Sequence, residues 1–359
     1  MTNPLVRPVP VALEPLVAAF REGKRAALAR AISLVEDERE GFQELLHELL
    51  RGGPRAGRLG ITGPPGAGKS TLLAALAGAY RAAGERVGVV AVDPTSPFSG
   101  GALLGDRIRM NDLATDPGIF IRSMATRGSL GGLATTTREI TDLMDAFEFE
   151  RVLVETVGVG QTELEISGAA DTVAVVLVPE SGDAIQAMKA GLMEIADVFV
   201  VNKADRPGAD LLIKEIRTAL HLRAGEAMHG VPAHHGVDAR AAAARAAAGG
   251  AGTAAAGWQV PVLRAVAQSG EGIVELVGVV AAHRAWLEAS GALGARRRAR
   301  AERHVLDVVE RALRRRTWTD AVVRARLTRG LDAVARREET PYSVAGAIVA
   351  YVLGEGRDA

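Results

Sequence analysis

Short valine-rich runs recur along the chain, and each is followed by turn residues and then by a stretch with helical spacing of apolar residues. The runs are residues 59–62, 87–92, 152–155, 173–178 and 198–201, and residues 261–267 are expected to form one more strand. Continuous apolar runs that alternate with helices are typical of a parallel sheet covered on both faces. The sequence therefore predicts an α/β fold of three layers with a mainly parallel sheet.

Helical segments are expected on both sides of this region. Residues 1–52 carry apolar side chains at helical spacing, among them Leu28, Ile32 and Val35, and residues 281–359 show the same pattern again. We expect an N-terminal helical segment (1–52), a central α/β domain (53–280) and a C-terminal helical arm (281–359). Within the central domain, residues 238–258 are almost entirely Ala and Gly, which predicts a surface loop.

Composition excludes several classes of function. The 359 residues include no cysteine, which excludes a disulfide scaffold, a thiolate metal site and a cysteine nucleophile. The 43 basic and 43 acidic residues balance, which argues against chain-wide attraction to nucleic acid or to an anionic membrane. No apolar run reaches the roughly 18–20 residues of a membrane span, and we expect a soluble, cytoplasmic protein.

A glycine-rich segment follows the first expected strand and precedes a helix. It reads GPPGAGKS from Gly63 to Ser70 and matches the phosphate-binding loop (P-loop). In such a loop, backbone N–H groups converge on phosphate oxygens, Lys69 reaches the β- and γ-phosphates, and the Ser70 hydroxyl binds magnesium. The expected phosphate-binding residues are Gly63, Pro65, Gly66, Ala67, Gly68, Lys69, Ser70 and Thr71.

A second motif, VNKAD at residues 201–205, indicates which base is bound. At the end of a buried strand, the Asp205 carboxylate can accept from the ring N–H and the exocyclic amine of guanine. Asn202 can bond the other edge of the base, and the Lys203 stem can lie along the ring. Adenine lacks these donors, so the motif favours GTP over ATP. Only 5 of the 43 basic residues are lysines, and two of these five, Lys69 and Lys203, lie in the two nucleotide motifs.

Acidic residues follow three of the expected strands or loops. Glu155 ends the run VLVE, Asp93 ends another run, and Asp106 follows in LLGDRIRM. Together with Ser70, these three carboxylates are the expected magnesium ligands, directly or through water. The alternatives are a turn-initiating role for Asp93 before Pro94 and a surface helix cap for Asp106.

A glycine-rich turn, VGVGQ, follows Glu155 and is the expected switch for sensing the nucleotide. The Gly158 N–H is placed to contact the γ-phosphate, and Gln161 is a candidate for orienting the attacking water. The spacing of Gln161 differs from that in signalling GTPases, so a hydrogen bond within the switch is the alternative. The catalytic candidates are Lys69, Asp93 and Gln161.

Longer runs of the sequence resemble one family. Besides GPPGAGKST they are GKRAALARAISLVED near the start, VDPTSPFSGGALLGDRIRM, RGSLGGLATTTRE, VLVETVGVGQ, VPESGDAIQAMKAGLMEIAD, VNKAD and the closing AGAIVAYVLG, so the resemblance covers nearly the whole chain. The chain resembles the methylmalonyl-CoA mutase-associated GTPases of the MeaB and MMAA type, also described as ArgK-like, within the SIMIBI class of P-loop GTPases.

The resemblance implies a homodimeric GTPase that uses GTP/GDP and Mg²⁺. It also implies that the partner is an adenosylcobalamin-dependent acyl-CoA mutase, whose cofactor loading it gates and which it protects or reactivates. Low intrinsic hydrolysis, stimulation by the mutase, and a dimerising C-terminal arm are expected, with no nucleic-acid or membrane partner. By the same resemblance, Asp183, Gln186 and Lys189 belong to a further switch that couples to the mutase. Read without the family, Lys189 is a solvated charge on an amphipathic helix.

Three departures from the family pattern stand out. Val266-Ala267 replaces the expected Ser-Ala turn, which leaves backbone contacts from Ala267 to the base. The stretch between His221 and Trp258 is longer and richer in Ala, and residues 179–183 carry an acidic residue in a loop that is often neutral.

Three other functions are alternatives. Nickel-insertion GTPases share the fold, but their metal sites use Cys or His-rich tails, and only the pair His234-His235 could serve here. A kinase of a transport binding protein needs a base for its acceptor hydroxyl, for which the sequence offers no distinct candidate. The arginine clusters 296–298 and 314–316 are interspersed with acids, which favours a solvated face or dimer rim over nucleic-acid binding.

Overall fold

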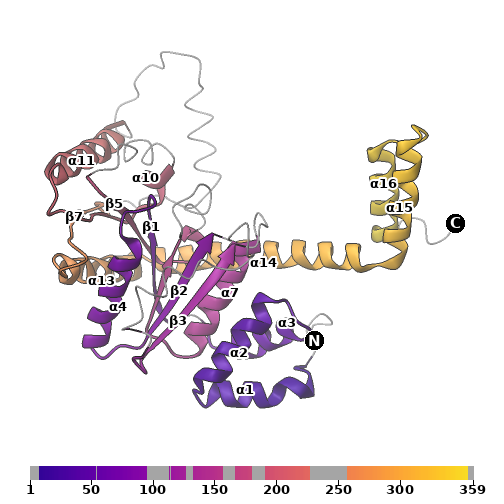
Figure 1. Ribbon diagram of the computed structural model, residues 1–359, viewed down its shortest axis with the longest axis horizontal. Coiled ribbons are helices and arrows are strands. Elements are labelled where there is room, and N and C mark those ends of the chain that lie inside the picture. The colour runs from indigo at the N-terminus through magenta and orange to yellow at the C-terminus, as the bar shows by residue number, and fades with distance from the viewer. Residues whose placement is uncertain are drawn as a thin grey trace. The chain divides into compact units, whose positions relative to one another are not determined.

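The valine-rich runs form the central sheet of a computed structural model, shown in Figure 1. The structure describes residues 8–53, 55–94, 113, 115–126, 132–156, 166–179, 191–226 and 257–354. Within these ranges the sheet has seven strands, all parallel, in the order β3-β2-β4-β1-β5-β6-β7. Helices cover both faces, so the predicted three-layer α/β fold is confirmed.

The strands are β1 (Gly57–Thr62), β2 (Val87–Pro94), β3 (Ile119–Thr126), β4 (Arg151–Glu155), β5 (Thr172–Leu177), β6 (Val198–Val201) and β7 (Val262–Arg264). The helices before and between them are η1 (Val11–Leu13), α1 (Glu14–Arg21), α2 (Arg25–Glu36), α3 (Phe42–Leu49), α4 (Lys69–Ala82), α7 (Gly132–Ala146), η2 (Ile166–Gly168), α10 (Met193–Ile195) and α11 (Ala209–Glu226). The last four helices are α13 (Ile273–Ala289), α14 (Ala292–Thr319), α15 (Ala321–Ala335) and α16 (Pro341–Leu353).

Strand side chains alternate between two buried faces. On one face, Leu59, Ile61 and Leu153 pack with apolar residues of α4 and α13. On the other, Val152 and Val154 pack with α7 and the N-terminal helices, while β5, β6 and β7 pack with α11. Every residue of β5 and β6 is buried, which is why these strands read as unbroken apolar runs.

Sequence analysis did not identify β3, whose residues read IFIRSMAT. This strand lies at the edge of the sheet and pairs only with β2. Its polar pair, Arg122 and Ser123, interrupts the apolar run. Arg122 reaches outward to α2, where it forms an ion pair with Glu36 and donates to the hydroxyl of Ser33 at 3.2 Å. An edge strand has a partner on one side only, so it tolerates residues that a central strand excludes.

The N-terminal helices share a core with the sheet. Buried residues of α1, α2 and α3 belong to the same apolar cluster as α7, β2 and β4. Phe20 of α1 meets Phe147 edge to face, with ring centroids 5.0 Å apart. The chain forms two compact units, Met1–Arg300 and Ala301–Ala359, so helices α1–α3 lie in the same unit as the sheet.

The second unit holds a small core of its own. Val323 of α15 packs with Val344 and Ile348 of α16. The two helices approach so closely at Gly330 that a Cβ there would lie 2.4 Å from a methyl carbon of Val344. Asp320 caps α15 by accepting from two backbone N–H groups.

Among the described helices, none has both the length and the apolar content needed to cross a membrane.

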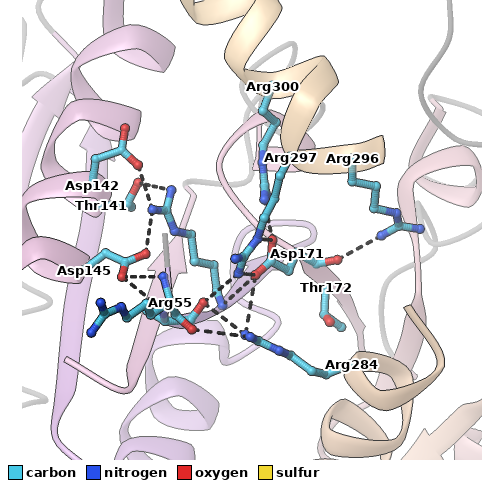
Figure 2. Close-up of polar contacts among 12 residues, drawn as sticks. Arg55, Thr141, Asp142, Asp145, Asp171, Thr172, Arg284, Arg296, Arg297 and Arg300 are labelled. Atoms are coloured by element: carbon cyan, nitrogen blue, oxygen red, sulfur yellow. Dashed lines mark hydrogen bonds and ion pairs between the residues drawn. The ribbon is translucent and has the colours of Figure 1, made fainter. Parts of the chain in front are cut away.

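The amino ends of β5 and β6 carry a buried ionic network, and Figure 2 shows the part of it around Asp171. Asp171, which directly precedes β5, accepts from Arg297 at 2.9 Å and pairs with Arg300. The carboxylate of Asp197, which directly precedes β6, accepts hydrogen bonds from both terminal nitrogens of Arg296, at 2.8 and 3.0 Å. Since all three arginines lie in the first turns of α14, the network fixes the start of that helix to the sheet.

The charges in this network are strongly coupled. Burial alone would raise the pKa of Asp171, but the guanidinium groups of Arg300 and Arg297 outweigh it and hold the pKa well below its usual range. Nearby, burial lowers the pKa of His283, whose Nδ1 lies 2.9 Å from the Thr172 hydroxyl. Asp171 therefore stays ionised, because its neutral form would leave buried guanidinium groups uncompensated.

We expect Asp171→Asn to lower the free energy of unfolding by about 3–5 kcal/mol at pH 7, because buried cations lose their counterion. The folded-state pKa of Asp171 lies below its unfolded value near 3.9, so its contribution is complete above about pH 4 and declines as pH falls toward the folded pKa. Urea unfolding at pH 7 and pH 3 measures this. Asp210→Asn, which disrupts the exposed pair with Arg264, is the control and should cost less than about 1 kcal/mol. Equal losses in the two variants would contradict the account.

Candidate functional site

The glycine-rich loop connects the carboxyl end of β1 to the first turn of α4. Three of its glycines have positive φ, at +136° for Gly63, +75° for Gly66 and +85° for Gly68. Lys69 is the first residue of α4, and its Nζ folds back to donate to the carbonyls of Gly63 at 2.8 Å and Pro64 at 3.0 Å. The loop thus curls around the lysine, which places an ammonium group where phosphate oxygens are expected.

Two of these glycines are required by close approach as well as by φ. A Cβ on Gly63 would lie 2.1 Å from the carbonyl oxygen of Val176 in β5, and a Cβ on Gly68 would lie 2.4 Å from the amide nitrogen of Asn202. At Gly66 nothing lies within 4 Å of that position. The loop is therefore held against β5 at its start and against the base-recognition motif at its end, and it is open in the middle.

The second motif, at the end of β6, is bonded directly to the P-loop. The buried Asn202 donates to the Ala67 carbonyl at 2.8 Å and accepts from the Ala267 N–H at 3.0 Å. Lys203 has a left-handed backbone, with φ +55°, and its Nζ donates to the Gly66 carbonyl at 2.9 Å. Asp205 is exposed at the surface. The structure therefore brings together the two nucleotide motifs, which lie more than 130 residues apart in sequence.

The amide of Asn202 has a role that sequence analysis did not foresee. The sequence predicts a bond from Asn202 to the base, and that stays a prediction. In the structure both ends of the amide engage backbone groups, so Asn202 ties together the P-loop, β6 and the segment that follows β7. A buried amide joined to three chain segments holds these segments at fixed distances from one another.

The expected magnesium side of the site is formed by α4 and β4. The Ser70 hydroxyl donates to Oε1 of Glu155 at 2.7 Å, and both residues are buried. The backbone of Asp93 lies near the end of β2, where it pairs with Ala125 of β3, two residues beyond the pair of Ala91 with Glu155. All three residues stand at the carboxyl edge of the sheet, where the P-loop begins.

Several expected site residues lie outside the described part of the chain. They are Asp106, Gly158, Gln161, Asp183, Gln186 and Lys189. Their assigned roles stay predictions.

Sequence analysis missed two buried threonines beside these groups. Thr62 is the last residue of β1, and Thr156 directly follows β4. The Thr156 hydroxyl donates to the Thr62 hydroxyl at 3.0 Å. A polar residue at the end of an otherwise apolar strand is a weak signal, and only the register of β1 against β4 shows that the two meet.

Comparison with known proteins identifies the family of this chain. The model of the family described as methylmalonyl Co-A mutase-associated GTPase MeaB matches residues 28–322. A Pyrococcus abyssi protein named as a GTPase is 42% identical over 96% of this chain and 98% of its own length. The Mus musculus protein named methylmalonic aciduria type A homolog, mitochondrial, is 35% identical over 79% of this chain and 65% of its own length.

A solved structure gives the same architecture. The crystal structure described as LAO/AO transport system kinase aligns with a TM-score of 0.64 and 26% sequence identity, and the alignment covers 97% of this chain and 100% of that one. The two chains therefore share their fold.

The two glycines Gly63 and Gly66 provide a matched test of the loop geometry. We expect Gly66→Ala to cost about 1–2 kcal/mol of unfolding free energy, which is the cost of a left-handed backbone without steric contact. Gly63→Ala should cost clearly more, because the carbonyl of Val176 in β5 has to move. Urea unfolding without nucleotide measures both. If the two variants lose the same stability, the P-loop is not held against β5 as described.

Proposed function

The chain belongs to the family of methylmalonyl Co-A mutase-associated GTPases MeaB, and from this premise we propose that it serves an adenosylcobalamin-dependent acyl-CoA mutase. It is a GTPase, as its family is. In the proposal, GTP hydrolysis gates the loading of adenosylcobalamin into the mutase and protects or reactivates that enzyme. The observation that carries the proposal is the family match over residues 28–322. In support, a hydrogen bond from Asn202 to the Ala67 carbonyl links the VNKAD motif to the P-loop. Methylmalonyl-CoA mutase is the first candidate, since the family is named for it.

The nucleotide would lie along the carboxyl edge of the sheet. The P-loop backbone and Lys69 would bind the phosphates, and Lys203 and Asp205 would bind guanine. Phosphoryl transfer to water depends mainly on positioning and on neutralising charge. Asn202 supports that positioning, because it fixes the base end of the site relative to the phosphate end.

The residues present fit a magnesium ion bound with the nucleotide. Mg²⁺ prefers hard oxygen ligands and keeps several waters, and here a hydroxyl and a carboxylate, Ser70 and Glu155, lie 2.7 Å apart beside the P-loop. We propose that Ser70 binds the ion directly and that Glu155, Asp93 and Asp106 hold it directly or through water. The ion would neutralise charge on the β- and γ-phosphates.

Hydrolysis should be slow in the isolated protein and faster with the mutase. Phosphoryl transfer needs a well-ordered water and added positive charge, and partners of other GTPases supply both by ordering switch segments. We propose that the segment around Gln161 is the nucleotide-sensing switch, and that Asp183, Gln186 and Lys189 carry the effect of the mutase to it.

We expect the cognate mutase to raise the GTP hydrolysis rate of this protein at least about tenfold. Phosphate release is measured at saturating GTP, alone and with methylmalonyl-, isobutyryl- or ethylmalonyl-type mutase. Lys189→Ala should keep the intrinsic rate and lose most of the stimulation. An unchanged GTP hydrolysis rate with every mutase would rule out the proposed partner class. Equal stimulation of the wild type and of Lys189→Ala would mean that Lys189 is a solvated surface charge with no part in the coupling.

The C-terminal unit supports a proposal of homodimer formation. Val305, Leu306, Val309 and Leu313 lie along one face of α14 at spacings of three, four and seven or eight residues, and each is exposed by about half or more. A contiguous exposed apolar face on a soluble domain marks an interaction surface. We propose that a second copy of the chain covers it.

Substitutions at two neighbouring positions test the dimer. Leu313→Glu puts a charge into the apolar face, and we expect it to shift the protein to monomer in light scattering at micromolar concentration. Arg314→Glu changes an exposed residue that points away from that face and should leave the dimer intact. A wild-type protein that is monomeric at these concentrations would refute the proposal.

A further inference from the structure

β1 and β4 separate at the point where the P-loop and the expected switch begin. The last paired residues are Ile61 and Glu155, and the Thr156 N–H then donates to the Ile61 carbonyl at 3.2 Å. One position further on, the Thr156 hydroxyl donates to the Thr62 hydroxyl at 3.0 Å. This hydroxyl bond is the last link between the two strands that the described residues show before Gly63 turns into the P-loop.

Both threonines are buried, so the bond forms away from water. Thr62 has no exposed surface and Thr156 is 6% exposed. A buried hydroxyl that loses its partner keeps its desolvation penalty, whereas removing both hydroxyls removes the penalty together with the bond. The pair therefore favours one register of the strand ends, and replacing one member alone costs more stability than replacing both.

The register of these strand ends determines where Glu155 points. Side chains alternate along a strand, so Glu155 shares the face of Leu153, which packs toward α4, and Thr156 lies on the opposite face. On the α4 side, Glu155 accepts from the Ser70 hydroxyl at 2.7 Å. A hydroxyl link on one face thus anchors the backbone that carries the carboxylate on the other face.

We infer that Thr62 and Thr156 are positioning residues for the magnesium site, and that their hydroxyl bond holds the Glu155 carboxylate at Ser70. The inference rests on the proposed function, because it needs Mg²⁺ at Ser70 and Glu155. In this inference the pair binds neither nucleotide nor metal and acts through the end of β4. Without the hydroxyl bond, the backbone bond from Thr156 to Ile61 is left to hold the end of β4, and the Glu155 carboxylate is held less firmly at Ser70.

A set of isosteric variants separates positioning from stability. Thr156→Val leaves the Thr62 hydroxyl without this donor and should lower stability, whereas the double variant T62V/T156V removes both hydroxyls and should unfold at nearly the wild-type urea concentration. Thr156→Ser keeps the hydroxyl. The four proteins are compared in urea unfolding, in kcat and KM for GTP, and in the Mg²⁺ concentration that gives half-maximal hydrolysis.

If the pair positions Glu155, the double variant needs about five- to tenfold more Mg²⁺ and has a lower kcat, while KM for GTP changes little. Thr156→Ser should stay within about twofold of wild type in the Mg²⁺ response. A stable double variant with the wild-type Mg²⁺ response and kcat would overturn the inference and leave the proposed magnesium site intact. Wild-type hydrolysis that is unchanged by EDTA would overturn the magnesium site and the inference with it.

Discussion

The nucleotide end of this protein depends on the close contact between the P-loop and β5. Gly63 leaves β1 with φ +136° and passes so near the carbonyl of Val176 that no side chain fits. Because the loop starts in this fixed place, Lys69 folds back to the Gly63 carbonyl, and the Ser70 hydroxyl contacts Glu155 at the end of β4. The steric limit at one residue thus sets the positions of the groups expected to meet the phosphates and the metal.

Polar groups are buried at both ends of the central strands, with different partners. At the carboxyl ends they are hydroxyls and single charges joined by individual hydrogen bonds, as between Ser70 and Glu155, beside the Asn202 amide that ties three chain segments together. At the amino ends, Asp171 and Asp197 are fully engaged by arginines from α13 and α14. A closed ionic network suits a fixed joint, whereas hydrogen bonds that can be replaced suit a binding site. The apolar middle of the strands separates the two.

The sequence predicts the parts of this structure that follow from local chemistry. The five valine-rich runs and residues 261–267 predict six of the seven described strands, and the spacing in GPPGAGKS predicts a loop between a strand and a helix. The apolar pattern of the sequence does not reveal β3, because Arg122 and Ser123 interrupt the apolar run of this edge strand. It also could not show the bond from Asn202 to Ala67 or the pairing of Thr62 with Thr156, since both depend on the order of strands in the sheet. Local pattern thus predicts the buried central strands, whereas edge strands, register and neighbour order depend on tertiary structure.

Calorimetric titration with GDP and ADP in Mg²⁺ buffer, on wild type and on Asp205→Asn, tests the central claim that the joined P-loop and base motif form one guanine-nucleotide site. We predict that GDP binds one to one and at least about a thousandfold more tightly than ADP, and that Asp205→Asn loses most of that preference. Binding of ADP as tight as that of GDP, or a GDP preference that survives Asp205→Asn, would contradict the account.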